Sequence, residues 1–223
     1  MMAAPLIEVK NVFYDYVIRS GPVHALKGVD ASFEKGKMYA VTGRSGSGKT
    51  TLLSLIAAFD RPKSGEICYN GAALSSMDAS EYRRKNVGIV FQSFNLIPHL
   101  SVLENVTLVL EGAKMTRDER KARAESVLSL VGLGKELYSK RPSQLSGGEQ
   151  QRAAISRAIA ADQQVLLADE PTGNLDNENS ENVIGILKGL AREGRCVIVV
   201  THSVEVASSA DVILKMSDGM IIS

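Results

Sequence analysis

The sequence has no tryptophan, only two cysteines, and no long apolar run. Cys68 and Cys196 both lie in strand-like apolar stretches, which favours two buried, reduced thiols in a cytosolic protein over a disulfide between them. The longest apolar stretches, VLLA and CVIVV, have only the length of a strand. A transmembrane helix needs about 20 apolar residues, so the sequence predicts none.

An excess of charge of either sign is missing as well. Lys and Arg number 26 against 25 Asp and Glu, a net charge of +1, and no dense basic cluster stands out. A nucleic-acid partner normally requires a basic face, so no such partner is expected. The N-terminal stretch MMAAPLIEVKNV lacks a basic region followed by an apolar one, so a secretory signal is not expected either.

Apolar and alternating runs predict an α/β domain. Strands are expected at residues 6–14, 24–33, 37–43, 65–70 and 87–92, and again in QVLLADE, RCVIVVTH and DVILKMSDG after residue 164. The runs at 165–168 and 196–200 are solidly apolar, which is typical of parallel strands that helices cover on both faces.

Helix signals are concentrated in the middle of the chain. Helices are expected over residues 51–59, 101–112 (capped by Ser101), 116–132 (capped by Thr116), 148–161 and 177–192. Strands of the same kind flank the helical block. We therefore expect one domain, residues 1–223, with a core of about 1–92 and 164–223 and an inserted helical subdomain of about 93–163.

A glycine-rich motif follows the strand expected at 37–43. Its residues fill every position of G-x-x-x-x-G-K-[ST]: Gly43, Arg44, Ser45, Gly46, Ser47, Gly48, Lys49 and Thr50. Backbone N–H groups of such a loop, and the N-terminus of the helix after it, bind phosphate oxygens. Lys49 is expected to reach the β- and γ-phosphates of ATP, and the Thr50 hydroxyl to ligate Mg²⁺. Thr51 is counted among the ATP-binding residues.

Two adjacent carboxylates end the buried strand in VLLADE. In open α/β sheets, ligands bind at this edge. Asp169 is the candidate to hold Mg²⁺ through water, and Glu170 the candidate to polarise an attacking water. Such a pair is often only a helix cap, but beside a complete phosphate loop it favours catalysis.

Further motifs resemble those of one family, in the family's order and over nearly the whole chain. LSGGEQ at 145–150 is similar to the signature of ABC transporter nucleotide-binding subunits, QSFNL at 92–96 to their Q-loop, GNLD at 173–176 to their D-loop and THS at 201–203 to their switch. The resemblance implies a P-loop NTPase fold: a parallel-sheet core, an N-terminal antiparallel β subdomain and a helical insertion. It also implies ATP hydrolysis with Mg²⁺ as cofactor.

The resemblance assigns roles to residues outside the phosphate loop. Gln92, His202 and Asp176 join Glu170 as catalytic residues, and Gln92 is also expected at the metal. An aromatic residue from VFYDY would stack on adenine. Strand alternation puts Tyr14 and Tyr16 on one face, and the family spacing favours Tyr16.

In this family the signature loop acts on the ATP of a second subunit. Ser146, Gly147 and Gly148 would cap the γ-phosphate held by the partner's phosphate loop, so a head-to-tail dimer completes two sites. The resemblance further implies a separate membrane permease. The chain would then lie at the cytoplasmic face of the membrane. The segment SFNLIPHLSVLENV (93–106) is expected to contact the permease, because Phe94, Leu96, Ile97 and Leu100 expose apolar surface in a loop. The alternative is that these residues only pack the helical subdomain on the sheet.

Within the family, ADEPTGNLD and IPHLSVLENV look most like the ATPases of lipoprotein-release, macrolide-efflux and antimicrobial-peptide export systems. Nothing follows MIIS, so no C-terminal regulatory domain is expected. An alternative is an ABC ATPase that regulates a membrane partner without transport, as in cell division. A DNA-repair or ribosome-associated role is disfavoured by the balanced charge and by the short interval from Gln92 to Ser146.

Overall fold

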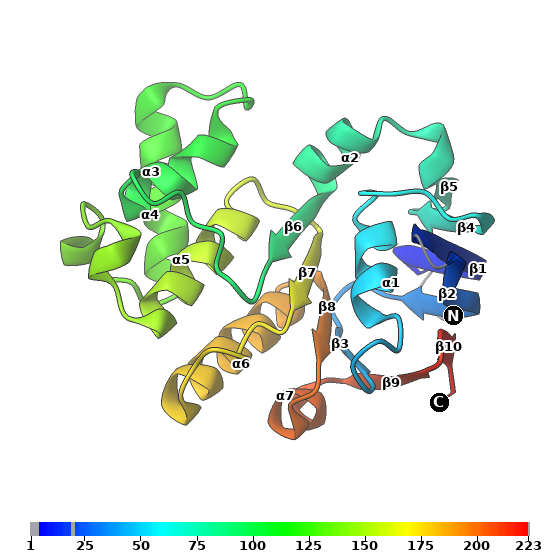
Figure 1. Ribbon diagram of the computed structural model, residues 1–223. Helices are drawn as coiled ribbons and strands as arrows, with labels where there is room; N and C mark the ends of the chain where they lie inside the picture. The colour runs from blue at the N-terminus through cyan, green and yellow to red at the C-terminus, as the bar shows by residue number, and fades with distance from the viewer. Residues whose placement is uncertain (1–4, 19–20, 223) are drawn as a thin grey trace.

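The computed structural model describes residues 5–18 and 21–222 and contains two sheets (Figure 1). No secretory signal is expected in the stretch MMAAPLIEVKNV. Its residues 1–4 lie outside the described residues. Helix α1 (Lys49–Ile56) lies between the two sheets, and its Leu52 and Ile56 are buried in the core that joins them. The phosphate loop immediately precedes this helix, so the loop is attached to an element that is buried in this core.

The first sheet is antiparallel, with the strand order β2-β1-β4-β5. Its strands are β1 (Ile7–Ile18), β2 (Gly21–Phe33), β4 (Ser64–Tyr69) and β5 (Ala72–Ala73). Strands β1 and β2 are longer than expected from the sequence, because their outer halves pair only with each other, as far as Ile18 opposite Gly21. Alternate residues such as Ile7 and Val9 are buried against α1. The N-terminal antiparallel sheet implied by the family resemblance is thus present.

The second sheet has the order β10-β9-β3-β8-β7-β6 and is parallel except for β10. Its strands are β3 (Met38–Thr42), β6 (Val87–Val90), β7 (Val165–Asp169), β8 (Cys196–Thr201), β9 (Val212–Ser217) and β10 (Met220–Ile221). Together the two sheets confirm the predicted α/β class. The carboxyl ends of β3, β7 and β8 lie at one edge of this sheet, where the phosphate loop begins.

Helices cover both faces of the parallel sheet, as its solidly apolar strands predict. In β8, Ile198 and Val200 pack in the core around α1, whereas Val197 and Val199 pack in a second core. That second core contains residues of α6 (Asn177–Arg192) and of α7 (Val204–Ser209). Because successive side chains of a strand point to opposite faces, each strand needs apolar residues at every position.

The helical part of the chain leaves the sheet after β6 and returns at β7 (Figure 1). It contains α3 (Val102–Thr107), α4 (Arg117–Leu130) and α5 (Gly147–Ile159). The predicted caps are confirmed, since Ser101 and Thr116 each form a capping box with the glutamate three residues later. Short 3₁₀ turns at Lys135–Leu137 and Pro142–Gln144 connect α4 to α5.

The single helix expected over 101–112 is wrong in its length. The α-helix ends at Thr107, and a 3₁₀ turn, Leu108–Leu110, follows. The Thr107 hydroxyl donates to the backbone carbonyls of Leu103 and Glu104, at 2.9 and 3.2 Å. Such bonding of a threonine to the preceding turn commonly distorts a helix, and 3₁₀ geometry is frequent at helix ends.

The apolar loop before α3 is less exposed than the sequence suggests. Its four apolar residues are only half-exposed: Phe94, Leu96, Ile97 and Leu100. Asn105 holds the loop, because its side chain accepts from the Ile97 N–H at 2.7 Å and donates to the Ile97 and Leu100 carbonyls, each at 3.2 Å. Arg157 of α5 donates to the carbonyl of Phe94. These polar contacts fold the loop back onto the helices.

Several short elements were not anticipated from the sequence. Helix α2 (Ala79–Asn86) is mostly polar and buries only Tyr82 among its residues, so it carries almost no apolar periodicity. Its start is marked by Asp78, whose side chain accepts from the Glu81 N–H. Ser203 caps α7 in the same way. Within residues 5–18 and 21–222, none of the helices has the length and apolar character that a bilayer crossing requires.

Candidate active site

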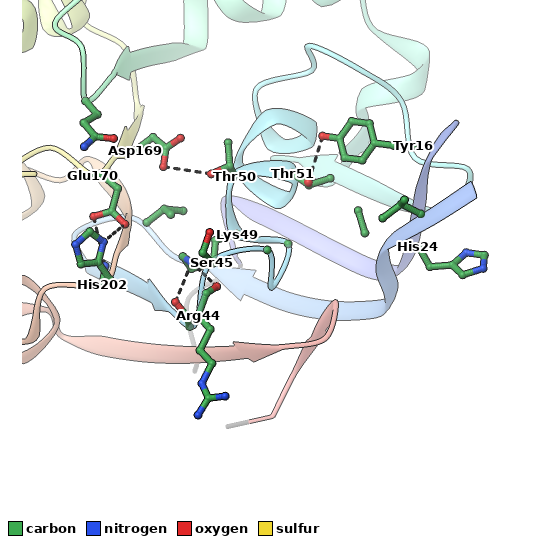
Figure 2. A pocket seen from close by; sticks show the side chains of 17 residues that line it. Tyr16, His24, Arg44, Ser45, Lys49, Thr50, Thr51, Asp169, Glu170 and His202 are labelled. Atoms are coloured by element: carbon green, nitrogen blue, oxygen red, sulfur yellow. Dashed lines mark hydrogen bonds and ion pairs between the residues drawn. The ribbon is translucent and has the colours of Figure 1, made fainter. Parts of the chain in front are cut away.

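A cleft of about 640 Å³ lies at the carboxyl ends of β3, β7 and β8 (Figure 2). It is lined by these residues singled out from the sequence: Tyr16, Gly43, Arg44, Ser45, Gly46, Gly48, Lys49, Thr50, Thr51, Gln92, Asp169, Glu170 and His202. Ser47 is in the same loop, but its side chain is buried and faces away from this cleft. Segments far apart in the sequence therefore meet around one cavity.

The glycines of the phosphate loop are required by its backbone. Gly48 has φ +101° and directly precedes α1, and a Cβ there would lie 2.6 Å from the Ala25 carbonyl oxygen. A Cβ on Gly43, with φ +154°, would collide with the Met216 carbonyl oxygen. The loop can thus pass close to neighbouring backbone, which side chains at these positions would prevent. A glycine-rich loop of this kind directs backbone N–H groups toward a phosphate.

Lys49 is a buried cation. Its side chain is nearly buried, and Nζ donates to the carbonyls of Gly43 and Arg44 at 2.9 and 3.0 Å. Among the described residues, no carboxylate lies within 4.0 Å of this ammonium group. Burying a charge is costly unless it is paired, so the site suits an anion that supplies the missing charge. The N-terminus of α1 beside it favours a phosphate.

Thr50 and Asp169 place two side-chain oxygens close together in the cleft. The Thr50 hydroxyl donates to Asp169 Oδ1 at 3.4 Å (Figure 2). Burial raises the pKa of the Asp169 carboxyl, and the Thr50 hydrogen bond opposes that shift. The described residues contain no group of three or more His, Cys, Asp or Glu that could hold a metal ion by themselves. Hydroxyl and carboxylate oxygens fit Mg²⁺, which takes its remaining ligands from water and phosphates.

Glu170 and His202 form a pair across adjacent strands. The His202 ring nitrogen Nδ1 lies 2.7 Å from Glu170 Oε1 (Figure 2). Glu170 Oε2 also accepts from the Thr201 hydroxyl at 3.2 Å, a contact that sequence reasoning missed although Thr201 stands in the THS motif. Glu170 adopts φ +47°, uncommon for a residue with a side chain. The His202 backbone N–H also donates to Oε2 at 3.4 Å, so three contacts hold this carboxylate in the cleft.

Gln92 lies beside the segment that follows Glu170. The Asn174 side chain donates to the Gln92 backbone carbonyl at 3.0 Å. A Cβ on Gly173 would come within 2.8 Å of Gln92 Nε2. Asn174 is a further residue that sequence reasoning did not single out, although it belongs to GNLD. It ties the two loops together at the edge of the cleft.

Tyr16 stands on the opposite side of the cleft from Glu170. Its hydroxyl lies 3.2 Å from Thr51 Oγ1, and its ring is half-exposed toward the cleft (Figure 2). Tyr14 meets Tyr16 edge to face, with ring centroids 5.0 Å apart, as expected for residues on one face of a strand. Tyr14 does not line the cleft; its hydroxyl bonds to Asp60, and this bond and burial raise its pKa to about 12.

The signature residues lie outside this cleft. Ser146 caps α5 and accepts from the Glu149 N–H at 3.3 Å, with Gly147 and Gly148 in the first turn of the helix. Asp176 is also outside the cleft, since it caps α6 and accepts from the Asn179 N–H at 2.8 Å. The candidate residues therefore form two separate groups on one chain.

Comparisons with known proteins identify the family of the chain. The family model described as "ABC transporter" matches residues 26–173. An ABC transporter ATP-binding protein of Methanocaldococcus jannaschii, itself named as uncharacterized, is 43% identical over 97% of this chain and 98% of its own length. The macrolide export ATP-binding/permease protein MacB of Pasteurella multocida is 41% identical over 100% of this chain, which spans only 34% of that protein.

Solved structures give the same result. The dimeric structure of MJ0796, a bacterial ABC transporter cassette, has a TM-score of 0.89 at 39% identity and covers 97% of both chains. A second dimeric structure of that cassette, described as a post-hydrolysis state bound to ADP and Pi, also has a TM-score of 0.89, at 38% identity. By the family model and these relatives, the chain belongs to the ABC transporter family, as an ATP-hydrolysing nucleotide-binding domain.

Proposed function

We propose that this chain hydrolyses ATP in the cleft of Figure 2, within a head-to-tail dimer, and so drives a separate membrane permease. The observation that supports this most directly is the position of Glu170. Its carboxylate lies in the same cleft as the unpaired ammonium group of Lys49, so a proton acceptor and a phosphate site face one cavity. The direct test is phosphate release by the purified chain, which should require Mg²⁺ and stop when EDTA removes it.

The phosphate loop binds the triphosphate. Lys49 supplies the charge for the β- and γ-phosphates, and backbone N–H groups of the loop donate to their oxygens. Thr50, Asp169 and Gln92 would hold Mg²⁺. The metal, when bound, neutralises charge on the phosphates. Because Asp169 ends β7 and Thr50 stands in the first turn of α1, both are held by regular elements before the substrate binds.

Glu170 is the proposed base. A water attacks the γ-phosphorus, its proton passes to the Glu170 carboxylate, and the bond to ADP breaks, which yields ADP and phosphate. His202 and Thr201 contact the same carboxylate and orient it. Gln92 also lines the cleft, beside the segment that follows Glu170, and completes the set around the attacking water. Asp176 is assigned to the contact between subunits, because it stands beside the signature residues.

The separation of the two groups of residues supports the proposed dimer. Ser146 and the first turn of α5 present a hydroxyl and backbone N–H groups at a helix N-terminus, a suitable site for a phosphate oxygen. They do not line the cleft of their own chain. The ATP of a second copy is the ligand we assign to them. The dimeric cassettes to which this chain is similar support that arrangement.

Tyr16→Ala is expected to raise the dissociation constant for ATP about tenfold, with a smaller effect on turnover at saturating ATP. Loss of stacking on a base costs about 1–3 kcal/mol by alanine substitution. Titration with ATP, together with steady-state hydrolysis, measures both effects. Tyr16→Phe is the matched control, since it removes only the contact with Thr51 and should bind ATP almost normally. Equal weakening in the two variants would argue against stacking.

The permease is proposed to dock beside α2. A groove of about 530 Å³ there joins α2 and β6 to the 3₁₀ turn after α3 and is lined by both charged and apolar residues. They include Arg83, Arg84, Phe91, Leu108, Val109 and Arg157. The half-exposed loop residue Phe94, whose carbonyl accepts from Arg157, lies next to this groove. A peripheral position at the cytoplasmic face of the membrane, held by the permease, follows from this proposal.

Leu108→Glu should weaken stimulation of ATP hydrolysis by the permease while basal hydrolysis of the isolated chain stays near wild type. Leu108 is 38% exposed, so a charge there disturbs an interface more than the fold. Affinity purification from the native membrane, with ATP and Glu170→Gln, supplies the permease. Leu130→Glu, on the exposed side of α4, is the control. Full stimulation of Leu108→Glu would place the docking surface elsewhere.

The transported substrate is proposed to be a macrolide, a lipoprotein or an antimicrobial peptide. The similarity to macrolide export proteins supports this class. The permease recovered in the purification decides among these substrates, because transport by the reconstituted complex can be tested with each substrate in turn. A partner that moves none of them would favour the regulatory alternative.

A further inference from the structure

A groove of about 770 Å³ runs along the outer side of the phosphate loop, and Arg44 and Lys215 line it. Both side chains are exposed, and the Arg44 side chain extends away from Lys49 and Thr50 (Figure 2). Within the part of the chain that the structure describes, neither cation forms an ion pair. Asp218 also lines the groove but is not within 4.0 Å of them. The groove is therefore cationic and without an internal partner.

The start of α6 carries exposed acidic residues that also lack partners. Glu178 and Glu181 are exposed, and neither forms an ion pair among the described residues. Asp176 differs, because both its carboxylate oxygens accept from Asn179. Of the two unpaired glutamates, Glu178 is therefore the one nearer in sequence to the D-loop, residues 173–176.

This acidic segment is packed against the signature loop. A Cβ on Gly147 would lie 3.5 Å from Leu175 Cδ2, and one on Gly148 would collide with the Asn179 side chain. Arg152 of α5 donates to Asn179 Oδ1 at 3.2 Å. The signature loop and the start of α6 therefore form one surface. If the signature loop docks against a partner, the start of α6 must approach that partner as well.

The order of the segments along the chain decides which side of the partner's phosphate loop the start of α6 meets. Residues 171–176 connect Glu170, at the chain's own cleft, to a surface that acts on the cleft of the partner. In a two-fold dimer this connection lies near the axis between the two sites. Residues 171–176 must then face one particular side of the partner's phosphate loop. On each chain, this is the side nearer to His202 than to Tyr16. His202 lines the cationic groove, whereas Tyr16 does not.

We infer that Arg44 forms an ion pair with Glu178 of the partner subunit across the dimer interface, a contact that rests on the proposed head-to-tail dimer. Each dimer holds the pair twice, by symmetry. Opposite charges at matching positions steer two subunits into register and disfavour other docking modes. Arg44 thus acts as a residue that positions the subunits, in addition to the part its backbone plays in the phosphate loop.

Charge reversal tests the pair in the Glu170→Gln background, where we expect ATP to hold the dimer together. At saturating ATP and low ionic strength, Arg44→Glu should weaken dimerisation about tenfold in sedimentation, because two attractions become two repulsions. Glu178→Arg alone should weaken it similarly. Combining the two reversals should restore most of the affinity, and all these differences should shrink at high ionic strength.

Arg44→Glu with Glu181→Arg is the matched control, since Glu181 stands one helical turn further along α6 and should give no rescue. Any effect of Arg44→Glu on ATP binding is common to both double variants, so only the pairing distinguishes them. Normal dimerisation of Arg44→Glu, or equal rescue by Glu181→Arg, would overturn the inference. If Glu170→Gln alone fails to dimerise with ATP, the head-to-tail dimer itself is wrong, a separate result.

Discussion

Glu170→Gln should lower ATP turnover at least about 100-fold while ATP binding is retained, because a positioned general base contributes about 10² to 10⁴ in rate. The amide keeps the size of the carboxylate and one oxygen that Thr201 can donate to, but it cannot take a proton from water. Phosphate release under saturating ATP, with equilibrium binding measured on the same protein, separates the two effects. Size-exclusion chromatography should also show a dimer that persists only with ATP.

Glu111→Gln provides the control for a glutamate outside the cleft. Glu111 is exposed beside the start of α4 and lines no part of the cleft. The Glu111→Gln variant should therefore hydrolyse ATP at the wild-type rate. Turnover of Glu170→Gln within a few-fold of wild type would remove Glu170 from the reaction. The proton acceptor would then have to be sought among the other residues at the mouth of the cleft.

Ser146→Arg should block hydrolysis about 100-fold or more but leave ATP binding to the monomer close to wild type. Removing a group that stabilises charge on the reacting phosphate costs about this factor. Arginine is also too large for close approach to a γ-phosphate. Ser146 does not line its own cleft, so the chain's own phosphate loop is untouched. Lys49→Ala has the opposite effect, since it should weaken ATP binding itself about tenfold or more.

Mixing the two inactive variants gives the decisive measurement. In a mixed dimer, one composite site carries both lesions and the other carries neither. Random pairing of equal amounts makes half of the dimers mixed, so activity should reappear up to about a quarter of wild type. Each variant mixed with itself is the control and should stay inactive. Loss of ATP binding by monomeric Ser146→Arg, or no activity on mixing, would mean that the signature serves its own chain.

The helix starts and the phosphate loop could be predicted from the sequence because their chemistry is local. Ser101 and Thr116 cap their helices through a side chain only three residues away. The glycines of the loop are needed wherever the backbone takes a positive φ or passes close to another strand. Helix α2 was not predicted from the sequence, because its residues are mostly polar and show no apolar periodicity.

Contacts between distant segments could not be predicted in this way. The half-buried loop residue Phe94 is held through its backbone carbonyl by Arg157 of α5, which lies 63 residues away in the sequence. The sequence shows apolar residues in a loop but not which polar side chains will hold them. Thr201 and Asn174 were missed for the same reason, because each acts on a residue tens of positions away.

The α/β class, the phosphate loop and the family could be predicted from the residues alone, since these depend on short motifs and on the periodicity of apolar residues. Which of the candidate residues share a site depends instead on how the chain folds. Glu170 and His202 meet because β7 and β8 are parallel neighbours whose carboxyl ends coincide. Ser146 is kept from that cleft because α5 begins away from it. Strand order and helix direction are set by long-range packing, which no local pattern records.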